Sequence, residues 1–303
     1  MKYNTRIAPS PTGFFHLGTA RVAYHNWLMA RATGGKFLVR IDDTDAARND
    51  DKYVDLIYQS LDWLGLDFDD TFKQSSRFGH HKDVAQLLLD KGFAVYDQDA
   101  IRLNADFVID AWCDYKGNKT SISKDNIDFA KKQILIKSNK TPIYHFASIV
   151  DDIDSDINLI LRGSDHVANT SKQIFILKAL CDAGYKNINY DSLKFCHVGL
   201  IIVQDGVTKK MVKLSKRDNR ASLMHYKDND YNAQSILNAV LKLGWSHPDA
   251  NFDKHQPLVD KAVALQSILQ GDFKIKNATF DLDKLNWLDK KYKVRAQQNI
   301  NKP

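Results

Sequence analysis

Cysteine is scarce in this sequence, and the few cysteines present are isolated from one another. Cys113, Cys181 and Cys196 lie far apart, and none belongs to a C-x-x-C motif. This spacing argues against a disulfide framework and against a cysteine-rich zinc site. Proline and glycine are also few, with 6 and 14 among 303 residues, which argues against collagen-like or large disordered stretches.

Long apolar runs are missing as well. No run approaches the roughly 20 residues that a helix needs to cross a bilayer. The first ten residues, MKYNTRIAPS, lack the apolar core of a signal peptide. We therefore expect a cytoplasmic protein that has no membrane partner.

Neither sign of charge dominates the composition, but the two signs are unevenly distributed. The chain has 43 Lys and Arg against 37 Asp and Glu, a net charge of +6. Carboxylates crowd residues 42–70, whereas basic residues dominate 207–220 and the tail from 284. A basic C-terminal half suits contact with a nucleic-acid backbone, although solvated surface lysines produce the same pattern.

The first 41 residues have the pattern of a strand, a helix and a second strand. Residues 5–8 and 37–41 are predicted strands, and a loop rich in Pro and Gly (9–18) leads into a helical pattern that ends at Gly34 and Gly35. Such a βαβ unit implies a parallel sheet that binds ligands beyond the carboxyl ends of its strands.

Alternating elements continue along the rest of the chain. Helices are predicted at 50–64 and 80–91, the second capped by Gly92. The irregular segment 97–141 indicates an insertion, after which a strand (157–161), a helix (171–183) and a strand (195–203) resume the sheet. Further helical patterns follow at residues 232–243, 255–269 and 283–290.

Two short motifs suit the binding of a nucleoside triphosphate. HLGT (16–19) stands where the first strand meets its helix, and a helix N-terminus favours anions. The second, KLSKR (213–217), follows the last predicted strand, and its lysines can neutralise charge that develops on pyrophosphate. Each motif alone also fits a purely structural role: His16 could serve only to cap a helix, and KLSKR could be a basic surface loop. Their order around a split sheet favours the functional interpretation.

Together with other segments, these motifs resemble the class I aminoacyl-tRNA synthetases, and among them the glutamyl-tRNA synthetase family. HLGT and KLSKR match the HIGH-type and KMSKS-type signatures of that family. The resemblance covers nearly all of the chain, through RIAPSPTG (6–13), GGKFLVRIDDTD (34–45), LDWLGLDFDD (61–70), TPIYHFASIVDD (141–152), LRGSDHVANTSKQ (161–173) and LKLGWSHPD (241–249).

The resemblance implies an α/β fold with a Rossmann-type catalytic domain and four parts. Residues 1–96 would form the first half of that domain, 97–141 an inserted element that binds the acceptor end, and 142–205 the second half. Residues 206–303 would hold the KLSKR loop and a mainly helical stem-contact domain.

The resemblance also implies a reaction. The substrate's carboxylate attacks ATP, with Mg²⁺ on its phosphates, and glutamate then passes from the adenylate to the terminal adenosine of tRNA. Because that carboxylate is the nucleophile, no covalent enzyme nucleophile is needed, and catalysis rests on positioning and electrostatics. We expect a monomer that binds glutamate and the acceptor arm of tRNA, without structural zinc or another protein-bound metal.

Site residues follow from the matched motifs. The implied catalytic residues are His16, Gly18, Lys213, Ser215 and Lys216. Those implied for glutamate are Arg6, Ala8, Ser10, Asp42, Tyr144 and Arg162. For ATP they are Thr12, His16, Gly18, Thr19, Asp165, Ile201, Ile202, Lys213 and Lys216.

The sequence departs from the family pattern at three places. Asp42 stands where the family's R-I-E-D-T-D run has a Glu that binds the substrate ammonium, and Cys113 alone remains in the region where some members bind zinc. Asp218 and Asn219 follow KLSKR where the family often has His-Gly. The chain also ends soon after residue 293, so we expect it to lack the family's anticodon-binding domain.

This early end leaves other functions open. A glutamyl-queuosine synthetase-like enzyme would glutamylate a modified tRNA base, and a noncatalytic tRNA-binding paralogue would keep the fold without the reaction. Glutamylation of a carrier other than tRNA, and glutamine as the substrate, also stay open.

Overall fold

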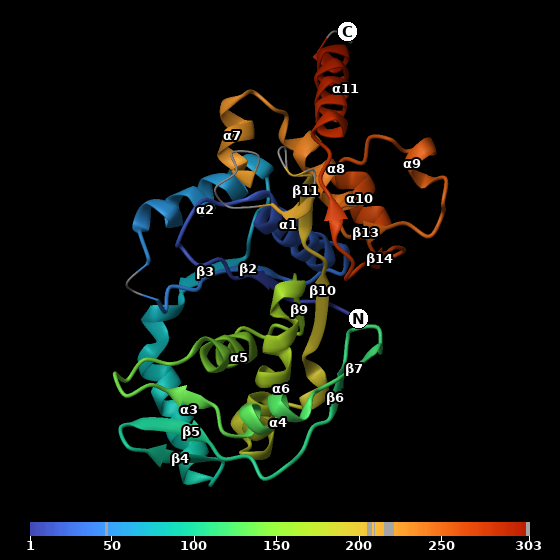
Figure 1. Ribbon diagram of the computed structural model, residues 1–303. Helices are drawn as coiled ribbons and strands as arrows, with labels where there is room; N and C mark the ends of the chain where they lie inside the picture. Colours follow the sequence, from blue (N-terminus) through green and yellow to red (C-terminus); the bar gives the residue numbers. More distant parts are fainter. Residues whose placement is uncertain (46–47, 205–207, 209, 215–220, 301–303) are drawn as a thin grey trace.

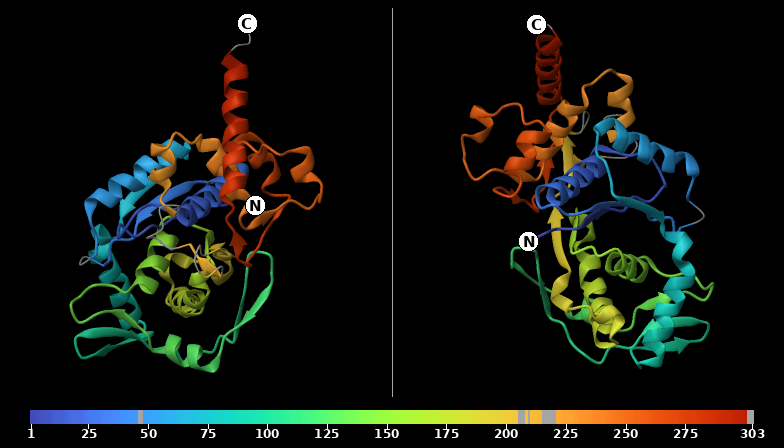
Figure 2. Two further views of the ribbon diagram at one scale, coloured as in Figure 1. Left: turned by 45° about the horizontal axis from the view of Figure 1, so that its top comes forward. Right: turned by 180° about the vertical axis from the view of Figure 1, so that it is seen from behind.

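In the computed structural model, the residues described are 1–45, 48–204, 208, 210–214 and 221–300, without the side chains of residues 299 and 300. Figures 1 and 2 show the sheet strands at the centre, with helices above and below them.

The first half of the sheet contains three parallel strands. Its order is β1 (Thr5–Ile7), β2 (Phe37–Ile41) and β3 (Asp70–Lys73). Helices α1 (Leu17–Ala32) and α2 (Asp51–Leu64) form the crossovers and lie above the strands in Figure 1. Every side chain of β2 is buried, which explains its continuous FLVRI run in place of an alternating pattern.

The second half adds a parallel pair on the other side of β1. Strand β9 (Leu159–Gly163) pairs with β10 (Lys194–Val198). Helices α5 (Tyr144–Asp154) and α6 (Val167–Asp182) lie below the strands in Figure 1, on the face opposite α1. The chain adds strands outward from β1 in one direction and then outward from β9 in the other. This change in strand order creates the switch point at which such sheets bind ligands.

The two halves meet at the amino ends of β1 and β9. There the backbone N–H of Leu159 donates to the carbonyl of Asn4, at 3.3 Å. Further along, the carbonyl of Leu161 accepts from the Asn26 side chain of α1 at 3.0 Å, while the Thr5 hydroxyl donates to the Asn26 carbonyl. The Asn26 residue of α1 therefore links the two halves of the sheet through the first residue of β1 and the middle residue of β9.

An antiparallel element lies between the halves. Helix α3 (Phe78–Asp90) leads into the sheet β4 (Ala94–Asp97), β5 (Ala100–Leu103) and β8 (Ile134–Ile136). Hairpin β6 (Ala111–Cys113) and β7 (Lys119–Ser121) and helix α4 (Lys124–Lys131) complete it. These elements lie at the end of the molecule opposite α11 in Figure 1.

The C-terminal part is mostly helical, and α11 projects from the body in Figures 1 and 2. Short strands support it: β11 (Ile201–Gln204) lies between β12 (Met211–Lys213) and β15 (Ala278–Thr279), and β13 (Trp245–Ser246) pairs with β14 (Asp272–Phe273). The helices are α7 (Leu223–Asp228), α8 (Ala233–Lys242), α9 (Phe252–His255), α10 (Lys261–Ser267) and α11 (Leu282–Ile300).

Two predicted elements were wrong because each is divided into two shorter elements. The strand predicted at 195–203 is two strands, which separate at Gly199, whose N–H donates to the carbonyl of Lys274. The helix predicted at 255–269 is two helices, α9 and α10. Pro257 cannot continue the first helix, and Asp260 caps the second by accepting from the N–H of Val263.

Other predicted helices exist but have different boundaries. Helix α3 begins at Phe78, two residues before the prediction, and ends at Asp90, followed by Gly92 with φ +80°. Helix α11 runs to Ile300, well beyond the predicted end at residue 290. The described helices include none that is both long and apolar enough to cross a membrane.

Candidate active site

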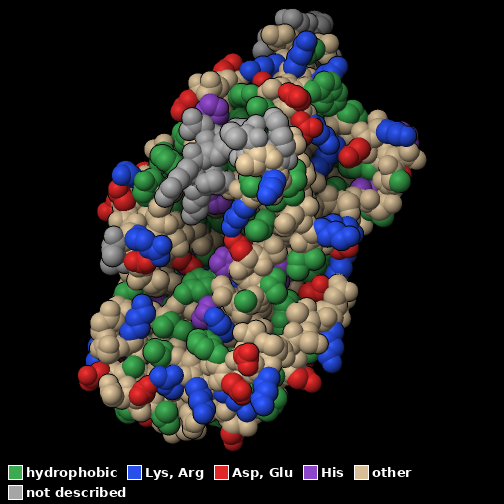
Figure 3. Space-filling model, viewed as in Figure 1, with side chains coloured by type: hydrophobic (Ala, Val, Ile, Leu, Met, Phe, Trp, Pro, Cys, Tyr) green, Lys and Arg blue, Asp and Glu red, His purple; other side chains and the backbone are tan. Residues whose placement is uncertain are grey.

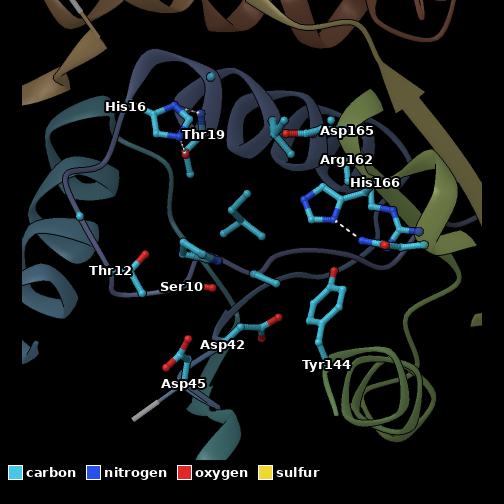
Figure 4. A pocket seen from close by; sticks show the side chains of 18 of the residues that line it. Ser10, Thr12, His16, Thr19, Asp42, Asp45, Tyr144, Arg162, Asp165 and His166 are labelled. Carbon is cyan, nitrogen blue, oxygen red and sulfur yellow. Dashed lines mark hydrogen bonds between the residues drawn. The ribbon is translucent and has the colours of Figure 1, made fainter. Parts of the chain in front are cut away.

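A cavity of about 1400 Å³ opens at the carboxyl ends of β1 and β9. Figure 3 shows the hollow between the upper and lower parts of the molecule, where histidine and acidic side chains reach the surface. In Figure 4, His16 and Thr19 border it from α1, Asp42 from the end of β2, and Tyr144 from α5. The predicted site residues among its lining are Arg6, Ala8, Ser10, Thr12, His16, Gly18, Thr19, Asp42, Tyr144, Arg162, Asp165, Ile201 and Lys213.

His16 is the N-cap of α1. Its Nδ1 accepts from the backbone N–H of Thr19 at 3.2 Å, and its Nε2 lies 3.1 Å from the Thr19 hydroxyl. A Cβ on Gly18 would lie 3.0 Å from the imidazole, so glycine provides room for the ring. The capping interpretation of His16 therefore describes this structure, and the same position puts the ring at the helix N-terminus, where anions are favoured.

Asp42 is ion-paired within a buried network. Arg40 Nε lies 2.6 Å from Asp42 Oδ1, and Arg40 Nη1 lies 2.7 Å from Asp152 Oδ1. The same Asp152 oxygen accepts from Arg6 Nε at 2.9 Å. The network joins β1, β2 and α5, and it orients Arg6 and Asp42 at the cavity wall.

Burial and charge oppose each other in this network. Burial works against the charge on Arg40, but Asp42 and Asp152 outweigh it, so the pKa of Arg40 lies well above its usual value. For Asp42, burial raises the pKa although Arg40 opposes that shift. Mutual pairing is what makes two arginines and two aspartates tolerable at 4% exposure or less.

Arg162 reaches the cavity from β9. Its Nη2 donates to the Thr170 hydroxyl at 2.8 Å, and its Nε to His197 Nε2 at 3.3 Å. Burial lowers the pKa of Arg162 below its usual value. That value starts so high that the guanidinium stays charged at neutral pH.

Three histidines surround this arginine, and the same environment keeps them neutral. Burial first, and Arg162 second, lower the pKa of His197 to about 3 and lower that of His166 as well. For His145, burial and then Lys172 lower the pKa to about 4.

At the other end of the cavity, Lys213 pairs with Asp165 at 3.1 Å. Burial works to raise the pKa of Asp165. The hydrogen bond from Lys213 and nearby positive charge outweigh burial, so the pKa of Asp165 lies below its usual value. The carbonyl of Ile201 accepts from the N–H of Leu214, and that of Ile202 from the N–H of Phe280. Unlike Ile201, Ile202 is not among the residues that line the cavity. Ser215 and Lys216 lie outside the described residues.

Comparison with known families accounts for this arrangement. The family model described as tRNA synthetases class I (E and Q), catalytic domain, matches residues 2–102 and 101–287. The chain belongs to this family. The resemblance inferred from HLGT, KLSKR and the segments between them is thereby confirmed.

Relatives in this synthetase family match along almost the whole chain. A glutamate--tRNA ligase of Francisella tularensis subsp. novicida is 35% identical over 95% of this chain and 65% of its own length. The glutamate--tRNA ligase of Geobacter sulfurreducens is 33% identical with the same coverage. This chain thus spans less than two thirds of the length of these relatives.

A solved structure shows that the fold is shared. The glutamate tRNA ligase of Elizabethkingia meningosepticum, solved in complex with its amino acid, superposes with a TM-score of 0.79. The superposition covers 96% of this chain and 70% of that one, at 23% identity. The predicted α/β fold with a parallel sheet is confirmed.

In the part of the chain that the structure describes, no group of three His, Cys, Asp or Glu side chains is arranged to hold a metal ion. The cysteine in the inserted element, Cys113, is exposed and free.

Several contacts at the site escaped the sequence analysis. Arg40 and Asp152 lie in matched segments, but nothing in a single sequence shows that they pair across 112 positions. Thr170 and His197 are 27 residues apart and meet because α6 returns the chain from β9 to β10. An arginine on a buried strand was an available signal, since a charged side chain there needs a partner.

Proposed function

We propose that this chain activates glutamate with ATP to form glutamyl-adenylate and transfers it to the 3′-terminal adenosine of tRNA. Glutamate would lie near Tyr144 and Arg162, and ATP between the HLGT helix and Lys213.

The observation that carries the choice of glutamate is the balance of buried charge. Within the ion-paired network and its neighbour Arg162, three arginines (Arg6, Arg40 and Arg162) provide positive charges and the paired Asp42 and Asp152 provide two negative ones. The other buried charges nearby have partners of their own, since Asp151 pairs with Arg77 and the charge of Asp165 acts on Arg21. Neutral histidines add nothing to this balance. A net charge of about +1 complements glutamate, which carries two carboxylates and one ammonium, whereas glutamine is neutral overall.

The residues at the ATP end support the first step. Attack of the substrate carboxylate on the α-phosphate increases negative charge on the leaving pyrophosphate. The N-terminus of α1, His16 and Lys213 border the cavity where that charge would develop. Mg²⁺ would accompany ATP through its phosphates. Lys213 must then exchange its bond with Asp165 for one with phosphate.

For the second step, we assign the parts of the chain as the sequence suggested. Residues 1–96 and 142–205 would form the catalytic domain, 97–141 would bind the acceptor end, and 206–303 the stem. Lys137 and Asn139 of the inserted part already line the cavity. We further propose a monomer that works in the cytoplasm, where ATP and tRNA are available.

The test is incorporation of labelled glutamate. The chain is incubated with glutamate, ATP and total tRNA, and ATP-pyrophosphate exchange is followed with and without tRNA, with glutamine in parallel. We expect exchange with glutamate and label that mild alkali releases from the terminal adenosine.

Other outcomes would contradict the proposal in recognisable ways. Exchange with glutamine alone would overturn the charge argument. Label on an internal base would assign the chain to tRNA-base glutamylation, and no exchange under either condition would leave a binding protein without this reaction.

A further inference from the structure

Arg162 is held by a closed triangle of hydrogen bonds that includes Thr170 and His197. Arg162 donates from Nη2 to Thr170 Oγ1 (2.8 Å) and from Nε to His197 Nε2 (3.3 Å), and the third side, Thr170 Oγ1 to His197 Nε2, is 3.1 Å. All three residues are buried, with exposures of 5%, 0% and 7% in the order Arg162, Thr170 and His197.

The donors and acceptors of the triangle fit only one protonation pattern. The Nε–H of Arg162 can only donate, so His197 Nε2 accepts and the imidazole is neutral, with its proton on Nδ1. The Thr170 oxygen accepts from Arg162, and its hydroxyl and the Arg162 Nε–H share the single lone pair of His197 Nε2. Thr170 and His197 thus each provide an acceptor for Arg162.

Aromatic packing fixes the planes of the His197 imidazole and the Arg162 guanidinium. The ring of Trp112, on β6, meets the His197 imidazole nearly edge-on, with centroids 5.4 Å apart. The guanidinium of Arg162 lies 5.7 Å from the centre of the Phe195 ring. Rotation of the imidazole or of the guanidinium would lose these contacts together with the hydrogen bonds.

The triangle leaves one guanidinium nitrogen for a ligand. Arg162 Nη1 is buried and has no hydrogen-bond partner among the described residues, although Arg162 lines the cavity. A buried donor without a partner is costly, and a substrate carboxylate would remove that cost.

We propose that Thr170 and His197 are positioning residues that aim Arg162 at the side-chain carboxylate of the substrate and thereby favour glutamate over glutamine. This inference rests on the proposed activation of glutamate. Neither residue touches the substrate; they act through the orientation of Arg162.

The experiment compares Thr170→Val with Thr170→Ser. Valine keeps the shape but removes the hydroxyl, whereas serine keeps the hydroxyl. Thr33→Val is the control, because the Thr33 hydroxyl likewise has two hydrogen-bond partners, the backbone N–H of Tyr3 (2.9 Å) and the carbonyl of Met29 (2.7 Å), but lies outside the cavity lining. KM and kcat for glutamate, glutamine and ATP are measured by pyrophosphate exchange in the presence of tRNA.

We expect Thr170→Val to raise KM for glutamate by about tenfold, the effect of one lost hydrogen bond to a charged group. KM for ATP stays unchanged, and the preference for glutamate over glutamine falls. Thr170→Ser restores the parent KM, and Thr33→Val loses stability without a change in KM. The histidine provides a second arm: His197→Leu repeats the Thr170→Val result, and His197→Gln, whose Oε1 can accept in place of Nε2, reverses it in part.

An unchanged KM for glutamate in Thr170→Val and His197→Leu would overturn the positioning role. Equal losses in valine and serine variants would do the same, because they would reflect packing. If the parent chain itself showed no exchange with glutamate, the proposed function would fail instead, so the two failures can be told apart.

Discussion

His16 illustrates how one residue can serve the helix and the ligand site at once. Its ring caps α1 through Thr19, and Gly18 leaves it just enough room. A phosphate that binds at the N-terminus of α1 would compete with His16 for the same backbone N–H groups. We therefore expect activity to depend on the orientation of the His16 ring as well as on the presence of a histidine.

Gly18→Ala tests this position. The new Cβ would lie 3.0 Å from two atoms of the His16 ring, so the ring must shift away from Thr19. We expect exchange activity to fall by about tenfold, the scale of one transition-state hydrogen bond. Stability changes little, because alanine gains about 1 kcal/mol of helix propensity over glycine, which offsets the weakened cap.

Gly79→Ala in α3 is the matched control for this substitution, since nothing lies within 4 Å of its Cβ position. It gains helix propensity and leaves exchange unchanged. Activity and urea unfolding are measured for both variants. Full activity in Gly18→Ala would show that the orientation of His16 does not matter to the reaction.

At the scale of residues, the motifs predicted which side chains line the cavity far better than which partners hold them. His16, Asp42 and Arg162 were found because they stand in matched segments. Their partners Arg40 and His197 depend on strand register and on crossover helices, which a single sequence does not specify. Ile202 does not line the cavity beside Ile201, because the alternation of strand β11 directs neighbouring side chains to opposite faces, and its role in binding ATP stays a prediction.

At the scale of elements, the junction of β10 and β11 shows a constraint that apolar periodicity conceals. Residues 195–203 are apolar almost throughout, and nothing in them requires a break except Gly199. The segment that passes over this glycine comes from residues 274–277, more than 70 positions away. Pro257 and Asp260, by contrast, are local signals from which the division between α9 and α10 could have been predicted, but the sequence analysis did not use them.

Gly199→Ala tests the junction. A Cβ there would lie 2.0 Å from the backbone carbonyl oxygen of Lys276, so the strand or the passing segment must move. We expect a loss of about 2 kcal/mol in the free energy of unfolding, within the range for overpacked sites. The effect is read from urea unfolding beside Gly79→Ala, which introduces the same methyl group into open space. A stability equal to the parent would mean that the segments slide apart at little cost.

At the scale of the whole molecule, α1 connects the catalytic sheet to the C-terminal helices. Arg21 donates to the carbonyls of Leu243 and Gly199, and His25 Nε2 lies 3.3 Å from the carbonyl of Leu241. The same helix begins at the ligand site with His16. These polar contacts tie the helix that begins at the ligand site to the C-terminal part.

The buried histidines make the stability of the whole molecule depend on pH. Burial first, then Arg21, lower the pKa of His25 to about 3 in the folded state, against an ordinary value of 6.5. His197 and His145, at about 3 and 4, behave alike. As the pH falls below 6.5, these histidines gain protons in the unfolded chain but not in the folded one, so stability is lost.

His25→Gln measures the share of one histidine. At pH 5, a histidine that stays neutral in the folded state costs about 2 kcal/mol relative to neutral pH. We expect the parent to lose stability steeply between pH 6.5 and 4. The glutamine variant, whose amide can still donate to Leu241, follows a shallower curve and regains about 2 kcal/mol of that loss at pH 5.

Exposed His255, on α9, provides the control. His255→Gln removes a histidine without removing a buried one, so its curve should follow that of the parent. Urea midpoints from pH 4 to 8 give all three curves. If His25→Gln kept the parent slope, His25 would have to bind its proton in the folded state, at the buried Nδ1, while Nε2–H keeps its bond to the Leu241 carbonyl.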